Sequence, residues 1–124
     1  MTPQPRDWSM TGFAPPPSAN KRTYSNHVLT KKYRSWRDDF GWRVRAARAP
    51  RFEGKVEVEL ILHEGRADAD NRIKALLDAL VTSYVIIDDS PKYVEKVTSR
   101  YAEPRVPFLR CMVIVRRVEA GRAE

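Results

Sequence analysis

The sequence predicts a small single α/β domain with a mixed sheet, in the element order β-α-β-α-β-β. Its 124 residues are enough for one hydrophobic core but not for two. Two segments repeat apolar residues at three- and four-residue intervals, as helices do, and others alternate over strand lengths. We therefore treat 1–124 as one domain, whose ends 1–13 and 117–124 can be flexible. We expect the helices to cover one face of the sheet.

The N-terminal third contains an expected strand, a turn and a long helix. Trp8 and Phe13 are candidate anchors of the strand. The turn follows at 15–20, where prolines fix the backbone and lack a donor. Thr30 is a suitable cap for a helix that we expect to continue to about Ala49. The apolar stripe of this helix consists of Tyr33, Trp36, Phe40, Val44 and Ala47.

Pro50 is expected to end that helix, because the residue before a proline avoids the α-helical region. A second helix is expected from about Asp70 to Ser83, and its apolar stripe consists of Ile73, Leu76, Leu77, Leu80 and Val81. The remaining strands are expected at 56–62, 94–102 and 107–116. In the first of these, the alternation places Val56, Val58, Leu60 and Leu62 on the core face.

The chain is strongly basic, with a formal net charge of +7 and a pI near 9.9. Between Lys21 and Arg51 there are ten Lys or Arg residues and two acids. This charge pattern favours a nucleic acid as partner, although a solvated basic face would have the same composition. The residues that we expect to contact DNA phosphates are Lys21, Arg22, Lys31, Lys32 and Arg34.

The single cysteine, Cys111, excludes an internal disulfide and lies in an alternating apolar run, where a small buried residue is expected. A lone thiol is consistent with a reducing cytoplasm. No apolar run approaches the length of a membrane span, and the first residues do not resemble a signal peptide. We therefore expect a cytoplasmic protein with no membrane partner.

Several acids of this basic chain gather around the second helix. Asp68 and Asp70 are two residues apart, so an extended backbone would place both carboxylates on one side. Asp89, beyond the helix, is the natural third member, provided that the chain returns to the start of the helix. Two or three carboxylates suffice for Mg²⁺, which keeps several of its waters. Lys74 lies one turn after Asp70, where its charge could stabilise an attacked phosphodiester.

Each of these residues also has a structural interpretation. Asp70 could cap the helix, and Asp78 could pair with Lys74 one turn away. Asp88-Asp89-Ser90-Pro91 is an ordinary turn sequence. The residues by themselves therefore leave two alternatives open, a metal site or a set of caps and turns.

The same residues form a pattern that resembles the RusA-type Holliday junction resolvases. The similarity is carried by Asp68-Ala-Asp70-Asn71-x-x-Lys74-Ala-x-x-Asp78-Ala-Leu80 and by Asp88-Asp89 after a short apolar run. Pro16-Pro17-Ser18-x-Asn20, the basic pair that follows it and the Tyr33-Arg34 step are similar as well. The resemblance extends from about Ala14 to about Val115.

The resemblance implies a small homodimeric endodeoxyribonuclease, encoded by a bacterium or a prophage, that acts in DNA recombination and repair. It implies that Asp68, Asp70 and Asp89 are catalytic aspartates that bind Mg²⁺ or Mn²⁺, and that Lys74 is catalytic. Supporting positions are Asn71, Asp78 and Asp88. The implied partner is branched DNA, the four-way junction, with no small-molecule cofactor. A two-fold dimer would supply two related sites for paired nicks.

Tyr84 departs from the family pattern, in which a glycine usually follows the acidic helix. A glycine there would serve as a left-handed cap. The tyrosine therefore predicts a different helix end and an altered placement of Asp88 and Asp89.

Three other functions fit the sequence in part. A non-catalytic DNA-binding module would keep the basic surface and use the acids as caps and turns. A small interaction or regulatory protein would use its charge for solubility. A metal nuclease for other branched or flapped DNA would share the acidic site, because the sequence shows the metal site better than the DNA shape.

Overall fold

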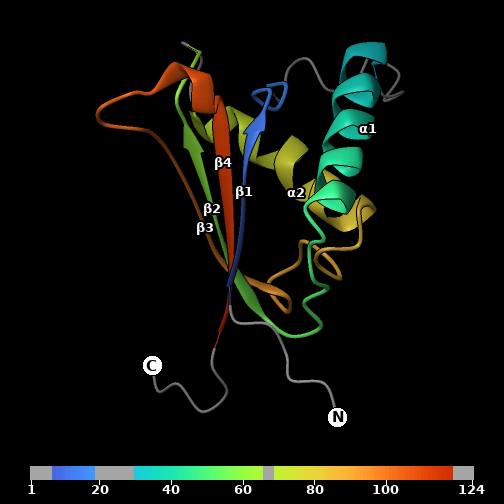
Figure 1. The fold of residues 1–124 in the computed structure, drawn as a ribbon. Coiled ribbons are helices and arrows are strands. Elements are labelled where there is room, and N and C mark those ends of the chain that lie inside the picture. The colour runs from blue at the N-terminus through green and yellow to red at the C-terminus, as the bar shows by residue number, and fades with distance from the viewer. Residues whose placement is uncertain (1–6, 19–29, 66–68, 119–124) are drawn as a thin grey trace.

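The computed structural model describes residues 7–18, 30–65 and 69–118. Four strands form one mixed sheet in the order β1-β4-β2-β3, and both α-helices lie on the same side of it (Figure 1). β4 pairs antiparallel with β1 and β2, whereas β2 and β3 are parallel. The strands are β1 (Asp7–Phe13), β2 (Val56–Leu62), β3 (Val94–Tyr101) and β4 (Cys111–Arg117). The helices are α1 (Lys31–Ala46), α2 (Ile73–Thr82) and the short 3₁₀ turns η2 (Ala69–Arg72) and η3 (Pro107–Leu109).

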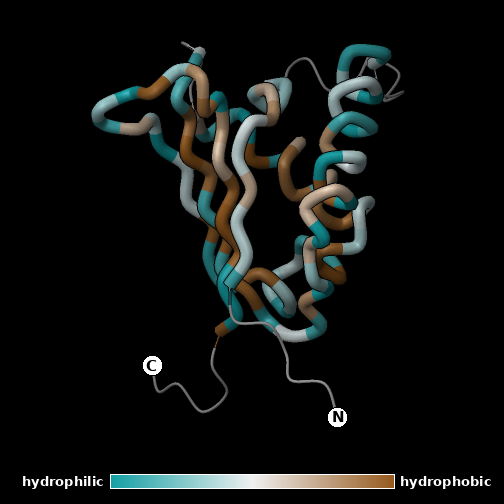
Figure 2. The backbone as a smooth tube through the Cα atoms, viewed as in Figure 1, coloured by the Kyte–Doolittle hydropathy of each residue, from teal (hydrophilic) through white to brown (hydrophobic). Residues whose placement is uncertain are grey.

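The inner face of the sheet and the apolar sides of both helices form the core. Figure 2 shows hydrophobic residues concentrated in the central strands and in α2, whereas α1 is mostly hydrophilic outside its buried stripe. The predicted core face of β2 is confirmed, because Val56, Val58, Leu60 and Leu62 are at most 2% exposed. Phe40 of α1 packs edge to face on Phe13, with ring centroids 5.1 Å apart. The predicted small α/β domain with a mixed sheet is thus confirmed.

The outer face of the sheet is partly charged. Glu59 of β2 accepts hydrogen bonds from Arg100 of β3 at 3.4 Å and Arg116 of β4 at 3.3 Å. Cys111 is buried at the start of β4, as predicted, and burial raises the pKa of its thiol to about 12. None of the helices in the described part of the chain is long and apolar enough to cross a membrane.

α1 begins at the predicted cap but ends earlier than predicted. The Thr30 side chain accepts a hydrogen bond from the Tyr33 N–H at 3.1 Å. The helix ends at Ala46, and Arg48 then takes a left-handed conformation with φ of 54°. The predicted end near Ala49 was therefore wrong, because the chain leaves the helix through Arg48 before Pro50 can act.

α2 also ends in a left-handed residue, and that residue is Tyr84 with φ of 65°. The Val85 N–H donates to the Leu80 carbonyl at 2.9 Å, and the Tyr84 N–H donates to the Val81 carbonyl at 3.1 Å. These two bonds define a Schellman motif, which usually contains glycine at this position. The prediction that tyrosine changes the helix end was wrong, because Tyr84 adopts the backbone conformation that a glycine would take.

The other boundaries differ by a few residues. α2 begins at Ile73 rather than Asp70, because the preceding four residues form the 3₁₀ turn η2. β4 begins at Cys111 rather than 107, because η3 intervenes. In α2, Ala75 and Ala79 are buried alongside the predicted leucines, whereas Ile73 and Val81 are only partly buried. The helix has α1 on one side and the sheet on another, so its buried face is wider than one stripe.

Candidate active site

The chain after α2 folds back beside that helix. The carbonyl of Val85 accepts a hydrogen bond from the Phe52 N–H at 2.8 Å, and Ile86 forms a parallel bridge with Phe52. This pairing anchors the buried apolar run beside the core. The Oδ2 of Asp89 then lies 3.1 Å from the Nζ of Lys74, a residue of the first turn of α2. The structure thus shows a contact between Asp89 and the acidic helix that the sequence left open.

Lys74 is the cation at the centre of this arrangement. Its Nζ also lies 3.5 Å from Oδ1 of Asp78, one helical turn away, as predicted for a pair at this spacing. The pKa of Lys74 is raised above 10.5, first by the hydrogen bond to Asp89 and further by the charge of Asp78, while partial burial opposes the shift. Lys74 therefore remains protonated at neutral pH and acts as a charge rather than as a base.

Asp70 lies in the 3₁₀ turn η2, immediately before α2. The residue that precedes α2 is Arg72, which makes no side-chain cap. The predicted capping role of Asp70 on this helix was therefore wrong. Its exposed carboxylate instead accepts a hydrogen bond from Ser99 Oγ of β3 at 2.8 Å. Ser99 was not anticipated from the sequence, because the contact depends on how β3 pairs in the sheet. The neighbouring Asn71 is exposed.

Asp88 and Asp89 have different surroundings although they are adjacent. Asp88 is exposed, and its pKa is lowered mainly by the backbone N–H of Asp89 and then by the Ser90 side chain. These are the contacts of a local turn. Asp89 is half-buried and points to Lys74. The supporting role expected for Asp88 is consistent with this geometry, in which it stabilises the turn that carries Asp89.

Asp78, Asp88 and Asp89 line one cavity of about 180 Å³, which we call the acidic pocket. Tyr33 and Arg37 of α1 form part of its wall. The sequence assigned Tyr33 to the core stripe and did not single out Arg37. Because Arg37 follows Tyr33 by one helical turn, the helical spacing alone could have placed both on the side of α1 that contacts α2.

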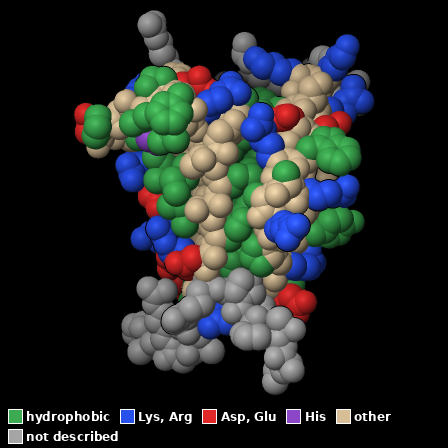
Figure 3. Space-filling view, in the orientation of Figure 1, with side chains coloured by type: hydrophobic (Ala, Val, Ile, Leu, Met, Phe, Trp, Pro, Cys, Tyr) green, Lys and Arg blue, Asp and Glu red, His purple; other side chains and the backbone are tan. Residues whose placement is uncertain are grey.

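Two predicted groups of residues fall partly outside the described ranges. Asp68, Lys21 and Arg22 lie outside them. Lys31, Lys32 and Arg34 are exposed on the first turn of α1. Figure 3 shows Lys and Arg side chains gathered at the right, over α1, with hydrophobic side chains between them. The described part of the predicted DNA contact surface is thus accessible.

The proline-rich segment is attached beside the acidic residues. The Trp36 Nε1–H donates to the Ala14 carbonyl at 2.7 Å, and Arg72 of η2 donates to the Pro16 carbonyl. Pro16 and Pro17 are buried. Pro16, in the described part of the element that resembles the family pattern, therefore contacts η2, the turn that carries Asp70.

The donor set can be compared with the needs of a metal ion. Within 7–18, 30–65 and 69–118, no three His, Cys, Asp or Glu side chains are grouped so that they could hold one. Asp70 and Asp89 supply carboxylate oxygens, which are the ligands that Mg²⁺ prefers. The third predicted ligand, Asp68, lies outside the described residues, so the donor chemistry fits Mg²⁺ and the metal site stays a prediction.

A comparison with protein-family models finds a match for most of this chain. Residues 13–107, more than half of the chain, match the family model described as endodeoxyribonuclease RusA. The matched range includes η2, α2, the turn that carries Asp89 and the exposed basic start of α1. No curated protein matches the chain.

Proposed function

The chain belongs to the RusA endodeoxyribonuclease family, and on this premise we propose that it is a metal-dependent nuclease that resolves Holliday junctions by paired nicks. The observation that carries the proposal is the 3.1 Å contact between Lys74 and Asp89. It brings an acid from beyond α2 to Lys74, four residues after Asp70 in the chain. Acids that served only as local caps and turns would not require this return.

Asp68, Asp70 and Asp89 are the residues that we propose to hold Mg²⁺ or Mn²⁺. Such a metal, when bound, lowers the pKa of a coordinated water and polarises a phosphoryl oxygen. Ser99 orients the carboxylate of Asp70 by donating to Oδ1, and Lys74 orients the carboxylate of Asp89. Asn71 and Asp78 flank these groups on the same helical segment.

Lys74 has a second task in this proposal. Cleavage of a phosphodiester increases the negative charge on the phosphate, and a fixed cation nearby stabilises that charge in the transition state. The raised pKa of Lys74 keeps the ammonium charged. Its 50% exposed side chain remains accessible to DNA from the solvent side.

The basic start of α1 supplies affinity for DNA. Lys31, Lys32 and Arg34, together with Lys21 and Arg22, are proposed to contact phosphates of the junction arms. Contacts of this kind give strong salt dependence and no sequence reading. Two copies related by a two-fold axis would present two acidic sites to strands of like polarity, and we propose a homodimer for this reason.

Nicking of a labelled synthetic four-way junction, beside a linear duplex of the same sequence, tests the proposal. We expect symmetric nicks in the junction with Mg²⁺, none with a chelator, and none in the duplex. Asp70→Asn should abolish the nicks and preserve junction binding. Asp39→Asn is the matched control, because the ion pair of Asp39 with Arg43 is exposed and contributes little.

Other outcomes would select a different function. Tight junction binding with no nicks in Mg²⁺ or Mn²⁺ would contradict a nuclease and favour a DNA-binding module. Equal nicking of flapped and four-way substrates would favour a nuclease for other branched DNA. Cleavage by the Asp70→Asn variant would contradict the proposed role of the Asp70 carboxylate as a metal ligand.

A further inference from the structure

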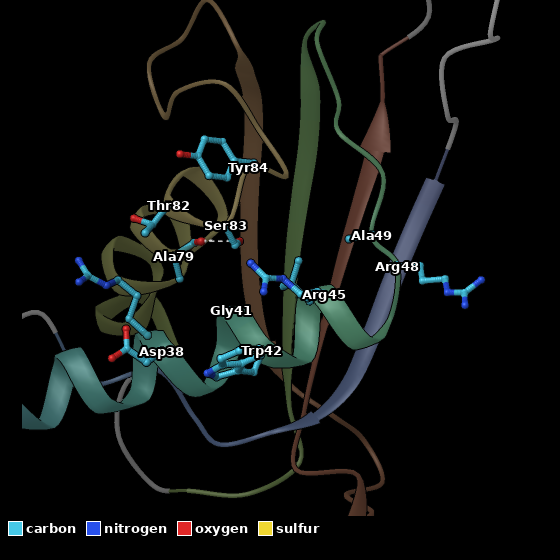
Figure 4. A pocket seen from close by; sticks show the side chains of 12 residues that line it. Asp38, Gly41, Trp42, Arg45, Arg48, Ala49, Ala79, Thr82, Ser83 and Tyr84 are labelled. Carbon is cyan, nitrogen blue, oxygen red and sulfur yellow. Dashed lines mark hydrogen bonds between the residues drawn. The ribbon is translucent and has the colours of Figure 1, made fainter.

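A second hollow, of about 550 Å³, lies between the C-terminal halves of α1 and α2. One wall carries Trp42 and Arg45 of α1, and the other carries Ser83 and Tyr84 after α2 (Figure 4). We call this hollow the arginine–aromatic groove. The proposed cleavage chemistry does not use it, and neither Trp42 nor Arg45 belongs to the matched acidic motif.

The groove presents two large aromatic rings to solvent. Trp42 is 67% exposed and Tyr84 is 73% exposed. An arginine lies over each ring, with Arg45 at 5.1 Å from the centroid of Trp42 and Arg51 at 5.6 Å from that of Tyr84. Arginine-stacked aromatic rings that remain open to solvent are suited to stacking on a further planar group.

The position of Tyr84 is unfavourable for a tyrosine. Its left-handed backbone would suit glycine, which has no Cβ to clash. Strained residues of this kind persist mainly where the side chain has a function. The Arg51 guanidinium also donates to the Tyr84 carbonyl at 3.2 Å, so the strained residue and its cation are fixed together.

The groove lies beside the acidic pocket. Arg37 and Thr82 line both hollows. The Nε of Arg37 is buried, and among the described residues it has no hydrogen-bond partner. The guanidinium of Arg37 lies over the ring of Tyr33 at 5.7 Å. The guanidinium of Arg37 also carries two terminal amino groups, which can donate to a phosphate oxygen.

We propose that the arginine–aromatic groove binds an unpaired stretch of DNA strand, with bases on Trp42 and Tyr84 and a phosphate on Arg37. The strand would continue from Arg37 into the acidic pocket. This inference rests on the proposed function, because the strand is taken to be part of the branched substrate. It adds a binding site for unpaired nucleotides to the phosphate contacts at the start of α1.

Charge favours DNA over a second copy of the chain as the occupant. The groove and its rim carry the cations Arg37, Arg45 and Arg51 beside a single nearby acid, Asp38, among the residues that line it. Two copies facing each other through this surface would oppose like charges. A polyanion would instead be attracted by the cations, and its bases would stack on the rings.

Binding of a labelled single-stranded oligothymidylate, measured by fluorescence anisotropy without metal, tests this inference. Trp42→Ala should weaken binding about tenfold, because one base can no longer stack. Trp42→Phe should recover part of the affinity, since it keeps a ring. Phe108→Ala is the matched control, because Phe108 is 81% exposed on η3 and does not line the groove.

The intrinsic fluorescence gives a second readout. Trp36 is 8% exposed and Trp8 is half-buried, so quenching by the oligonucleotide should come mainly from Trp42 and vanish in Trp42→Phe. Equal affinity of Trp42→Ala, Tyr84→Gly and the wild-type protein would overturn the inference. A changed sedimentation coefficient with unchanged affinity would also overturn it, and would identify the groove as a contact between copies.

The inference and the proposed function fail in different ways. If the wild-type protein nicks junctions while all groove variants bind the oligonucleotide equally, the groove inference is wrong and the nuclease stands. If no junction is nicked while Trp42→Ala loses oligonucleotide binding, the nuclease proposal is wrong and the groove stands. Asp39→Asn should bind the oligonucleotide like the wild-type protein, because Asp39 does not line the groove.

Discussion

The acidic pocket and the arginine–aromatic groove share two residues, Arg37 and Thr82, but they have opposite chemistry. Three aspartates line the pocket, and Lys74 pairs with two of them. The groove contains exposed rings with arginines stacked on them. In the function proposed above, Asp89 would help to hold a metal ion for the chemistry, while the arginines and rings of the groove would hold the strand. The comparison shows that acidic and basic side chains occupy separate hollows beside α1 and α2, although the protein as a whole is basic.

Among the cations beside the pocket and the groove, removal of Lys74 should have the largest effect. Lys74→Ala should slow junction cleavage roughly a hundredfold while changing the Kd much less, because the charge acts mainly in the transition state. Single-turnover cleavage and a gel-shift titration measure the two quantities. Lys96→Ala on the exposed side of β3 is the matched control. A loss confined to affinity would reassign Lys74 to DNA contact.

The ion pair between Lys74 and Asp89 should affect how the stability of the protein depends on pH. The folded pKa of Lys74 is raised above 10.5, so its stabilising contribution is fully present below about that pH and is lost as the pH rises through the folded value. In thermal melts between pH 7 and 12, Asp89→Asn should therefore reduce the alkaline loss of stability that the wild-type protein shows. Identical profiles for both proteins would contradict the pairing.

The basic start of α1 should affect affinity and leave the chemistry intact. Combined substitution of Lys31, Lys32 and Arg34 by alanine should reduce the slope of log K against log salt by about 0.9 for each phosphate that the variant no longer neutralises. The cleavage rate at saturating protein should stay near the wild-type rate. Junction binding measured at several salt concentrations gives the slope, and an unchanged slope would remove these residues from the interface.

The smallest effect is expected for Tyr84→Gly. This substitution should increase stability but weaken oligonucleotide binding. Tyr84→Gly should raise the free energy of unfolding by roughly 1 kcal/mol, because glycine takes the left-handed conformation without a Cβ clash. The same change should weaken oligonucleotide binding. Chemical denaturation measures the first quantity. A destabilised Tyr84→Gly would show that the ring makes contacts that outweigh the backbone strain.

Local patterns predicted most of the fold but only part of the site. Alternation predicted the core face of β2, and Thr30 capped α1 as its side chain suggested. The pair between Lys74 and Asp78 followed from helical spacing. The contacts of Lys74 with Asp89 and of Asp70 with Ser99 did not, because they depend on the return of the chain after α2 and on the pairing of β3.

The helix ends show a different limit of sequence reasoning. The helix ends were predicted from the local backbone preferences of Pro50 and of Tyr84, which stands where a glycine was expected. The structure instead places Arg48 and Tyr84 in the left-handed region, where tertiary packing after each helix decides the path. Arg37 was not predicted for a related reason, since the packing of α1 against α2 brings it to the wall of both hollows.

The most direct test of the central claim compares the adjacent residues Asp88 and Asp89 in single-turnover cleavage of a four-way junction with Mg²⁺. Asp88→Asn keeps an oxygen acceptor for the turn, so it should cleave at nearly the wild-type rate. Asp89→Asn should lose at least about a hundredfold in rate, since several kcal/mol of transition-state stabilisation depend on its carboxylate. Cleavage by Asp89→Asn at the wild-type rate would contradict the account.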